Sequence, residues 1–181
     1  MTQTLPTISM FEETGYFGGA VADEPHAALV AREVLAAGGS AADAAVALYF
    51  TLAVTYPSTA SLGGGGVCVV YEPDVVDGDA TEAIEFYARA SSPSATPPRR
   101  PNAVPGAVRG MYALHARYGR LPWSQLLAPA ESYARLGHRI SRALARDLRL
   151  AGAALFDTLE MRKNFVRSDG TLLAEGQRVH Q

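Results

Sequence analysis

The stretch LGGGGVCVVY at residues 62–71 constrains the fold more than any other part of this sequence. Four consecutive glycines cost chain entropy, so their use is a backbone with positive φ or the close approach of another chain or a ligand. The β-branched, apolar run that follows, 67–71, predicts a buried strand. We therefore expect a tight backbone platform that opens a central strand and forms one wall of a binding site. No Lys-Ser/Thr pair follows the glycines, which argues against a phosphate-binding loop.

Two helices are predicted before the glycine run. Asp23 and Glu24 precede Pro25, a favourable first helical residue, and the apolar spacing predicts a helix from 25 to about 37. Ser40 and Asp43 form a capping-box pattern that opens a second helix, which reaches residue 54. This second helix is apolar on all sides, so we expect it to be buried. Residues 16–22 predict a first strand.

Strand and helix signals alternate less regularly after residue 71. Residues 81–88 predict a second strand that forms an antiparallel hairpin with the glycine-led strand. Residues 91–105 contain five prolines and predict an extended surface loop. Further helices are predicted at 106–118, 124–136 and 141–155, followed by a turn at 168–170 between two short strands. The pattern is that of an α+β fold, preceded by a flexible N-terminal arm at residues 1–15.

Composition narrows the function classes. The 181 residues are 48% hydrophobic and 19% charged, which suits a packed core. The net charge of −2, with no basic block beyond Arg99-Arg100, argues against a nucleic-acid partner. Neither a membrane span nor a signal peptide is found, so we expect a cytoplasmic protein without a membrane partner. The single cysteine, Cys68, is expected to be a small core residue.

Arg89 is the main candidate for ligand binding. It stands at the end of a predicted strand, where a guanidinium can offer a fixed fork to a carboxylate, but the residues alone favour a surface arginine or a structural ion pair. The four histidines lack metal-ligand spacing, so we expect no metal and no other cofactor. Ser58 and its neighbouring hydroxyls have no general base placed near them by the sequence and are expected to cap backbone groups. Removal of Met1 would expose Thr2 as a nucleophile, but no predicted strand holds it.

Several motifs, in order, resemble the γ-glutamyltranspeptidase family. The similarity covers roughly residues 18–142, with a weaker continuation to 181, and its motifs are Gly19-Ala20-Val21-Ala22, Gly38-Gly39-Ser40-Ala41-Ala42-Asp43-Ala44-Ala45, Pro57-Ser58, Leu62-Gly63-Gly64-Gly65-Gly66, Arg89-Ala90-Ser91-Ser92-Pro93, Val104-Pro105-Gly106 and Arg117-Tyr118-Gly119-Arg120-Leu121-Pro122. The resemblance implies an N-terminal-nucleophile hydrolase fold, an α/β/β/α sandwich present here in part. Residues 16–181 then correspond to the N-terminal portion of the large subunit.

The resemblance also implies an activity. Family members cut themselves into a large and a small subunit, and the threonine exposed on the small subunit attacks a γ-glutamyl amide such as that of glutathione. The acyl group then passes to water or to an amine. No catalytic residue is expected on this chain, which would be inactive without the small subunit. Arg89 falls where the family arginine binds the α-carboxylate of the γ-glutamyl group, which favours substrate binding over the structural alternatives.

The sequence also departs from the family pattern. Ala90 stands in place of an acidic residue, Ser91-Ser92 in place of Thr-Ala, and Ser40 where asparagine is usual. The change beside Arg89 points either to looser support of the arginine or to a different acyl group. Two alternatives therefore remain: a truncated or degenerate relative that acts as a non-catalytic binding or assembly module, and a related acylase that acts on another amide.

Overall fold

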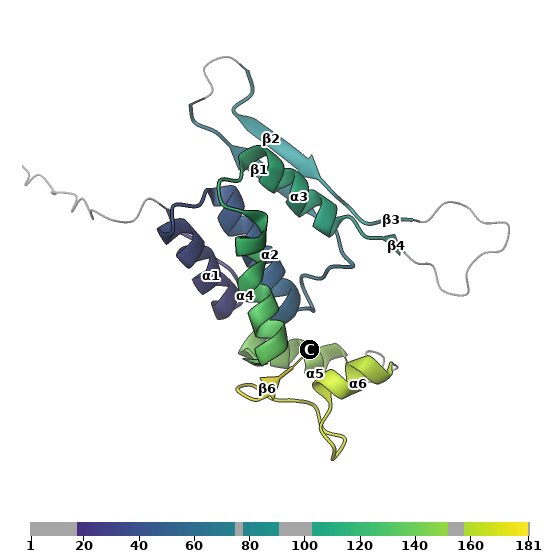
Figure 1. The fold of residues 1–181 in the computed structure, drawn as a ribbon. Helices are drawn as coiled ribbons and strands as arrows, with labels where there is room; N and C mark the ends of the chain where they lie inside the picture. The colour runs from purple at the N-terminus through teal and green to yellow at the C-terminus, as the bar shows by residue number, and fades with distance from the viewer. Residues whose placement is uncertain (1–17, 75–77, 91–102, 152–157, 181) are drawn as a thin grey trace, which may run out of the picture.

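Two capped helices form the centre of the protein. The computed structural model describes residues 18–74, 78–90, 103–151 and 158–180, and α1 (Pro25–Ala36) and α2 (Ala41–Thr55) pack against each other near its N-terminal end (Figure 1). The Glu24 carboxylate accepts the Ala27 amide at 3.0 Å, and Ser40 and Asp43 form the predicted capping box with bonds of 2.9 and 3.1 Å. The predictions for both helices, including the burial of α2, are confirmed.

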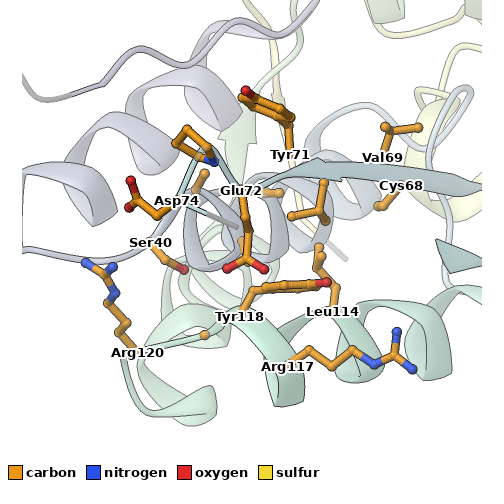
Figure 2. A pocket seen from close by; sticks show the side chains of 16 residues that line it. Ser40, Cys68, Val69, Tyr71, Glu72, Asp74, Leu114, Arg117, Tyr118 and Arg120 are labelled. Atoms are coloured by element: carbon orange, nitrogen blue, oxygen red, sulfur yellow. The ribbon is translucent and has the colours of Figure 1, made fainter. Parts of the chain in front are cut away.

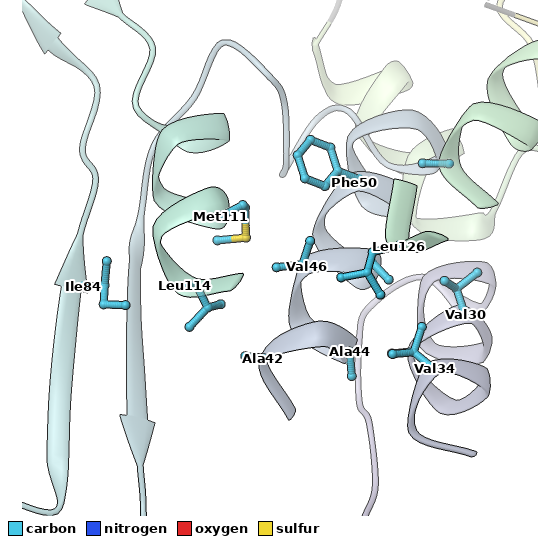
Figure 3. Close-up of a cluster of buried hydrophobic side chains, with 13 residues drawn as sticks. Val30, Val34, Ala42, Ala44, Val46, Phe50, Ile84, Met111, Leu114 and Leu126 are labelled. Atoms are coloured by element: carbon cyan, nitrogen blue, oxygen red, sulfur yellow. The ribbon is translucent and has the colours of Figure 1, made fainter. Parts of the chain in front are cut away.

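Helices α3 (Ala107–Tyr118) and α4 (Trp123–Leu136) complete the first core, and each ends at the predicted residue, directly before a glycine. Figure 3 shows the order of the layers: Ile84 of the hairpin faces α3, α3 faces α2, and α2 faces α1. The buried side chains of this first cluster come from all four helices and the hairpin: Val30, Ala31, Val34, Ala42, Ala44, Val46, Ala47, Phe50, Ile84, Met111, Leu114, Leu126 and Ala130. One continuous hydrophobic core therefore holds the hairpin and the helices together.

Strands β1 (Val67–Tyr71) and β2 (Thr81–Glu85) form the predicted antiparallel hairpin, in which Val69 lies opposite Ala83. The prediction that β1 is a buried central strand is wrong for this chain. Its inner face packs on the first core, but Val67, Val69 and Tyr71 on its outer face are 47%, 68% and 66% exposed. Within the described residues the sheet has only these two strands, so nothing covers the outer face.

The strand predicted at 81–88 is shorter than expected, because β2 ends at Glu85 and a second pairing begins at Arg89. Strand β3 (Arg89–Ala90) pairs antiparallel with β4 (Ala103–Val104). The sequence placed residues 103–104 in the proline-rich loop, and the structure shows instead that they form a strand. The rest of that predicted loop, 91–102, lies outside the described residues.

The C-terminal residues form a separate unit with its own small core. It consists of β5 (His138–Arg139), α5 (Arg142–Ala151), α6 (Leu159–Phe165) and β6 (Arg178–Val179), with β5 and β6 paired antiparallel. In Figure 1 this C-terminal unit lies at one end of the α1–α2–α4 helices. One member of its buried cluster, Tyr56, comes from just after α2. The other members are Ile140, Leu144, Ala145, Leu148, Phe165 and Val179.

Predictions for the C-terminal unit were less complete. Helix α5 and the turn at Gly170, with the bridge between Val166 and Leu172 beside it, are confirmed, whereas α6 and the β5–β6 pair were not predicted. Residues 152–157, the end of the helix predicted at 141–155, lie outside the described residues.

The predicted N-terminal strand is wrong where it can be checked. Residues 18–22 form no strand, because no described segment pairs with them, and the chain runs directly to the Glu24 cap. Residues 16 and 17, the arm at 1–15 and Thr2 lie outside the described residues. None of the helices among the described residues is both long and apolar enough to cross a bilayer.

Candidate functional site

The glycine run is clamped between two later segments of the chain. Gly66 and Phe86 exchange both backbone hydrogen bonds, at 2.9 and 3.3 Å, which extends the hairpin by one pair. The Gly64 carbonyl accepts the amides of Gly106 and Ala107, at 3.0 and 3.1 Å, at the start of α3. The run thereby joins the end of the hairpin to the first turn of a helix.

Close backbone approach explains why glycine is needed at two positions in this clamp. A Cβ atom at Gly65 would lie 2.4 Å from the backbone nitrogen of Ala88 and 2.5 Å from the carbonyl oxygen of Phe86. A Cβ atom at Gly106 would lie 2.1 Å from the same carbonyl oxygen. Real Cβ atoms do not approach backbone atoms this closely, so any side chain at either position displaces the 86–88 segment.

Arg89 directly follows the clamped segment 86–88. Its backbone pairs with Val104 in the β3–β4 ladder, and its side chain is exposed. Among the described residues, the Arg89 guanidinium forms no hydrogen bond or ion pair, so the structural ion pair considered for it is not found there. An arginine on a fixed strand, with its five donors unused, can bind a carboxylate in a bidentate manner. The structure thus places Arg89 at the start of the short strand β3, directly after the glycine clamp, and not at the end of the strand predicted at 81–88.

A cleft of about 880 Å³ lies on the inner side of the hairpin, between β1, the start of α2 and the end of α3 (Figure 2). Cys68 and Leu114 contribute apolar surface, and the charged lining residues are Glu72, Asp74, Arg117 and Arg120. Arg117 bonds to the Glu82 carboxylate, as does the Tyr118 hydroxyl. Arg89 does not line this cleft, so the cleft and the predicted ligand-binding arginine are separate.

Asp43 organises one wall of this cleft. The carboxylate is fully buried, and its Oδ2 accepts the amides of Ser40, Arg120 and Leu121 at 2.9, 2.9 and 3.2 Å. Burial raises the pKa of this carboxyl, but the hydrogen bonds from these amides and from Ser40 outweigh burial and hold the pKa below its usual value of 3.8. The capping box predicted the contact with Ser40. The contacts with the α3–α4 turn, 77 and 78 residues away in sequence, have no local signal.

The remaining polar candidates are structural, with one exception. Thr59 caps the Tyr56 carbonyl as expected, but Ser58 donates to the Asp147 carboxylate on α5 at 2.8 Å rather than to a backbone group. Two histidines have partners, since His26 donates to Glu24 at 2.7 Å and the His115 ring contacts the Leu121 carbonyl at 2.8 Å.

The exception is His138. It is buried, its Nδ1 lies 3.2 Å from the Arg139 carbonyl oxygen, and its Nε2 lacks a hydrogen bond of ordinary geometry. The described residues contain no group of three or more His, Cys, Asp or Glu side chains arranged to hold a metal ion.

Comparison with known proteins agrees with this geometry. The sequence pattern of the Gamma-glutamyltranspeptidase family matches residues 27–181. A glutathione hydrolase proenzyme of Pseudomonas aeruginosa is 40% identical over 143 residues, which are 68% of this chain and 24% of that protein. Glutathione hydrolase 7 of Homo sapiens is 37% identical over 142 residues, which are 72% of this chain and 21% of that protein.

Solved structures match over a larger share of the chain. The γ-glutamyltranspeptidase of Helicobacter pylori superposes with a TM-score of 0.78 at 30% identity, covering 91% of this chain and 50% of that chain. The Bacillus anthracis transpeptidase CapD gives the same TM-score and identity, and the superposition covers 54% of its chain. This chain spans about a quarter of the length of the curated relatives and about half of the solved ones. The chain therefore belongs to the γ-glutamyltranspeptidase family and contains an N-terminal part of that family's N-terminal-nucleophile hydrolase fold.

Proposed function

We propose that this chain is the N-terminal portion of an enzyme that cleaves γ-glutamyl amides, such as glutathione, and passes the acyl group to water or to an amine. In this proposal the threonine nucleophile lies outside this chain. Arg89 binds the α-carboxylate of the γ-glutamyl group and orients the scissile amide. The chain contributes no group to bond breaking, so its role is to bind and position the substrate.

The observation that carries this proposal is the fixed backbone position of Arg89. The residue follows a segment fixed by Gly65 and Gly106, whose Cβ atoms would collide with the backbone of that segment. Its guanidinium has no partner among the described residues, which leaves its full set of donors for a ligand. A rigid strand with an unused planar cation suits recognition of a small carboxylate, because little conformational entropy is lost when the ligand binds.

The partner in this proposal is a small subunit that carries the nucleophile. The outer face of β1 supports it, because Val67, Val69 and Tyr71 form an exposed apolar row on a sheet of only two strands. A two-stranded hairpin is marginal in water, and an apolar row of this kind is typical of a surface that another layer covers. The Pseudomonas aeruginosa relative is named a proenzyme, which agrees with a chain that matures into parts.

Reconstitution tests the proposal. The purified 181-residue chain, the threonine-bearing remainder and their mixture are each assayed with γ-glutamyl p-nitroanilide. We expect turnover only in the mixture, because neither part holds both the substrate-binding arginine and the nucleophile. Turnover by this chain alone would contradict the placement of the nucleophile. A stable but inactive complex would favour the non-catalytic module instead.

Replacement of Arg89 in the active assembly tests its role. Arg89→Ala is expected to lower kcat/KM about 10- to 100-fold, the usual effect of losing a charge-assisted hydrogen bond to substrate. Arg109, a second exposed arginine, lies on α3, and Arg109→Ala serves as the matched control with an expected change of less than twofold. An unchanged kcat/KM for Arg89→Ala would remove this residue from the site.

A different amide is the second candidate substrate, favoured by the residue that follows the arginine. Ala90 pairs with Ala103 in the β3–β4 ladder and offers no carboxylate beside Arg89. The capsule biosynthesis protein CapD of Bacillus anthracis, 34% identical over 139 residues, belongs to the same set of relatives. Parallel assays with glutathione and a β-lactam side-chain amide separate the candidates by kcat/KM.

A further inference from the structure

A cluster of polar side chains lies where the C-terminal unit meets the helical core. Glu24 is at its centre, with a fully buried carboxylate that caps α1. One oxygen accepts the Ala27 amide at 3.0 Å and the Thr55 hydroxyl at 2.9 Å, and the other accepts Nδ1 of His26 at 2.7 Å. The carboxylate thereby joins the start of α1 to the end of α2. This cluster has no assigned part in the proposed enzymatic function.

Two imidazole rings and a phenol meet beside this carboxylate. The His26 ring lies edge-on to Tyr133 of α4, with centroids 5.2 Å apart, and 6.2 Å from the ring of His138 on β5. His138 is 3% exposed, whereas the His26 side chain is 30% exposed. His138 belongs to the C-terminal unit, and His26 belongs to the helical core.

Each element packed against His138 contributes a charged or polar group. Burial lowers the pKa of His138 most, and the nearby His26 lowers it further, whereas the backbone carbonyls of Arg139 and Val54 and the Glu24 carboxylate raise it by less. His180, next to β6, packs against the backbone of Gly137. The groups that face this ring are Glu24 and His26 from α1 and its cap, Val54 from α2, Tyr133 from α4 and Arg139 from β5.

We propose that this cluster is an acid-sensitive junction, in which protonation of His138, buried beside His26, releases the C-terminal unit from the helical core. A positive charge on the His138 ring, which is 3% exposed and 6.2 Å from the ring of His26, has almost no access to water in the closed junction. Opening the junction hydrates the His138 ring. The Glu24 carboxylate keeps its bonds to the Ala27 amide and the Thr55 hydroxyl, so the α1 cap does not depend on His138.

The two hydrophobic clusters explain why only the C-terminal unit would be released. The cluster of the C-terminal unit includes Tyr56 and Leu52 from α2 and the residue after it, so separation removes part of that core. Two further contacts cross the junction, from Ser58 to Asp147 and from Arg146 to the Tyr56 hydroxyl at 3.4 Å, and both are exposed or partly so. The first cluster keeps all of its own members. We therefore expect the C-terminal unit to open while α1, α2 and α4 stay folded.

The direction of the pH effect follows from the lowered pKa of His138. An opened or unfolded chain binds a proton to this ring near pH 6.5, whereas the closed junction does so only at lower pH. The free energy of closing is therefore fully present above about pH 6.5 and decreases as the pH falls below that value. One histidine provides at most a tenfold change per pH unit, so opening should increase up to about tenfold between pH 7.5 and 5.5.

Hydrogen exchange of the 181-residue chain, expressed as protection factors, tests this proposal. The reporters are the amides of Ile140 and Gly176, which are bonded to Gln177 and Ile140 at 2.8 Å, and the internal reference is the amide of Val46 in α2. We expect the two reporters to lose about three- to tenfold protection between pH 7.5 and 5.5, with the reference unchanged. Equal losses in α2, or no loss in the reporters, would overturn the proposal.

Substitutions assign the effect to one ring. His138→Gln should make protection of the C-terminal unit independent of pH in this range, whereas His180→Gln, which changes an exposed histidine next to β6, should keep the pH dependence. If His138→Gln does not fold, an NMR titration of the imidazoles in the unchanged protein decides. A His138 ring that titrates at or above pH 6.5 with the C-terminal unit still protected would contradict the junction.

Discussion

The clamp around the glycine run makes a sharp prediction for Gly65→Ala. The new methyl group would lie 2.4 Å from the nitrogen of Ala88, 2.5 Å from the carbonyl oxygen of Phe86 and 2.7 Å from the carbonyl carbon of Tyr87. All three are backbone atoms, so no side-chain rotation relieves the contact. Overpacking of this kind costs about 1–3 kcal/mol. Displacement of the 86–88 segment also weakens its paired hydrogen bonds to Gly66, at about 1 kcal/mol each.

We therefore expect Gly65→Ala to lower the free energy of unfolding by about 2–4 kcal/mol. The melting temperature should fall by about 5–15 °C, since 1 kcal/mol corresponds to about 2–4 °C in a chain of this size. Thermal and urea unfolding followed by circular dichroism provide the measurement.

Gly63→Ala is the matched control from the same glycine run. A Cβ atom there meets nothing closer than the Ser61 hydroxyl oxygen at 3.8 Å, and φ at Gly63 is not positive. The control should stay within about 0.5 kcal/mol of the unchanged protein. If the two variants have the same stability, the close approach of the 86–88 segment does not explain the glycine run.

Three further predictions concern the buried polar groups. Asp43→Asn should lower the free energy of unfolding at pH 7 by about 1–2 kcal/mol in urea unfolding, because charged hydrogen bonds become neutral. Since the pKa of Asp43 is lowered in the folded protein, the stabilisation by its carboxylate is present above about pH 4. The difference in stability between the variant and the unchanged protein should therefore shrink as the pH falls below that value. Thr55→Val should cost about 1.5–3 kcal/mol in the same assay, because the Glu24 carboxylate loses a buried donor; an equal cost for the exposed Thr81→Val would refute this reason. Cys68 should react with a thiol reagent at pH 8 more slowly than free cysteine, because burial raises its pKa, and a rate equal to that of the unfolded chain would contradict its position on the inner face of β1.

Local rules predicted the helices well. The capping box at Ser40 and the acid–proline start at Glu24 depend on residues within one helical turn, so sequence spacing was enough to place α1 and α2. The pair of β5 and β6 could not be found in this way. Each strand has two residues, and they come together from positions 138 and 179, so neither has a periodic pattern of its own.

Burial was harder to predict than secondary structure. The apolar run 67–71 correctly indicated a strand, but apolar sequence alone does not show which layers are present to cover it. Glu24 was placed as an acidic residue directly before α1, whereas its contact with Thr55, 31 residues away, follows from the packing of α1 on α2. Arg89 was placed at the end of the strand 81–88, whereas it begins the separate strand β3, and the close contacts of Gly65 and Gly106 with the backbone of 86–88 depend on the tertiary fold.

The most direct test of the central claim is a cycle that pairs Arg89→Ala with removal of the substrate carboxylate. The active assembly is assayed with γ-glutamyl p-nitroanilide and with 4-aminobutyryl p-nitroanilide, which lacks the α-carboxylate. Binding of that carboxylate by Arg89 predicts that the variant loses about 10- to 100-fold in kcat/KM on the first substrate and less than about threefold on the second. Equal losses on the two substrates would contradict the account, because Arg89 would then affect the assembly without contacting the carboxylate.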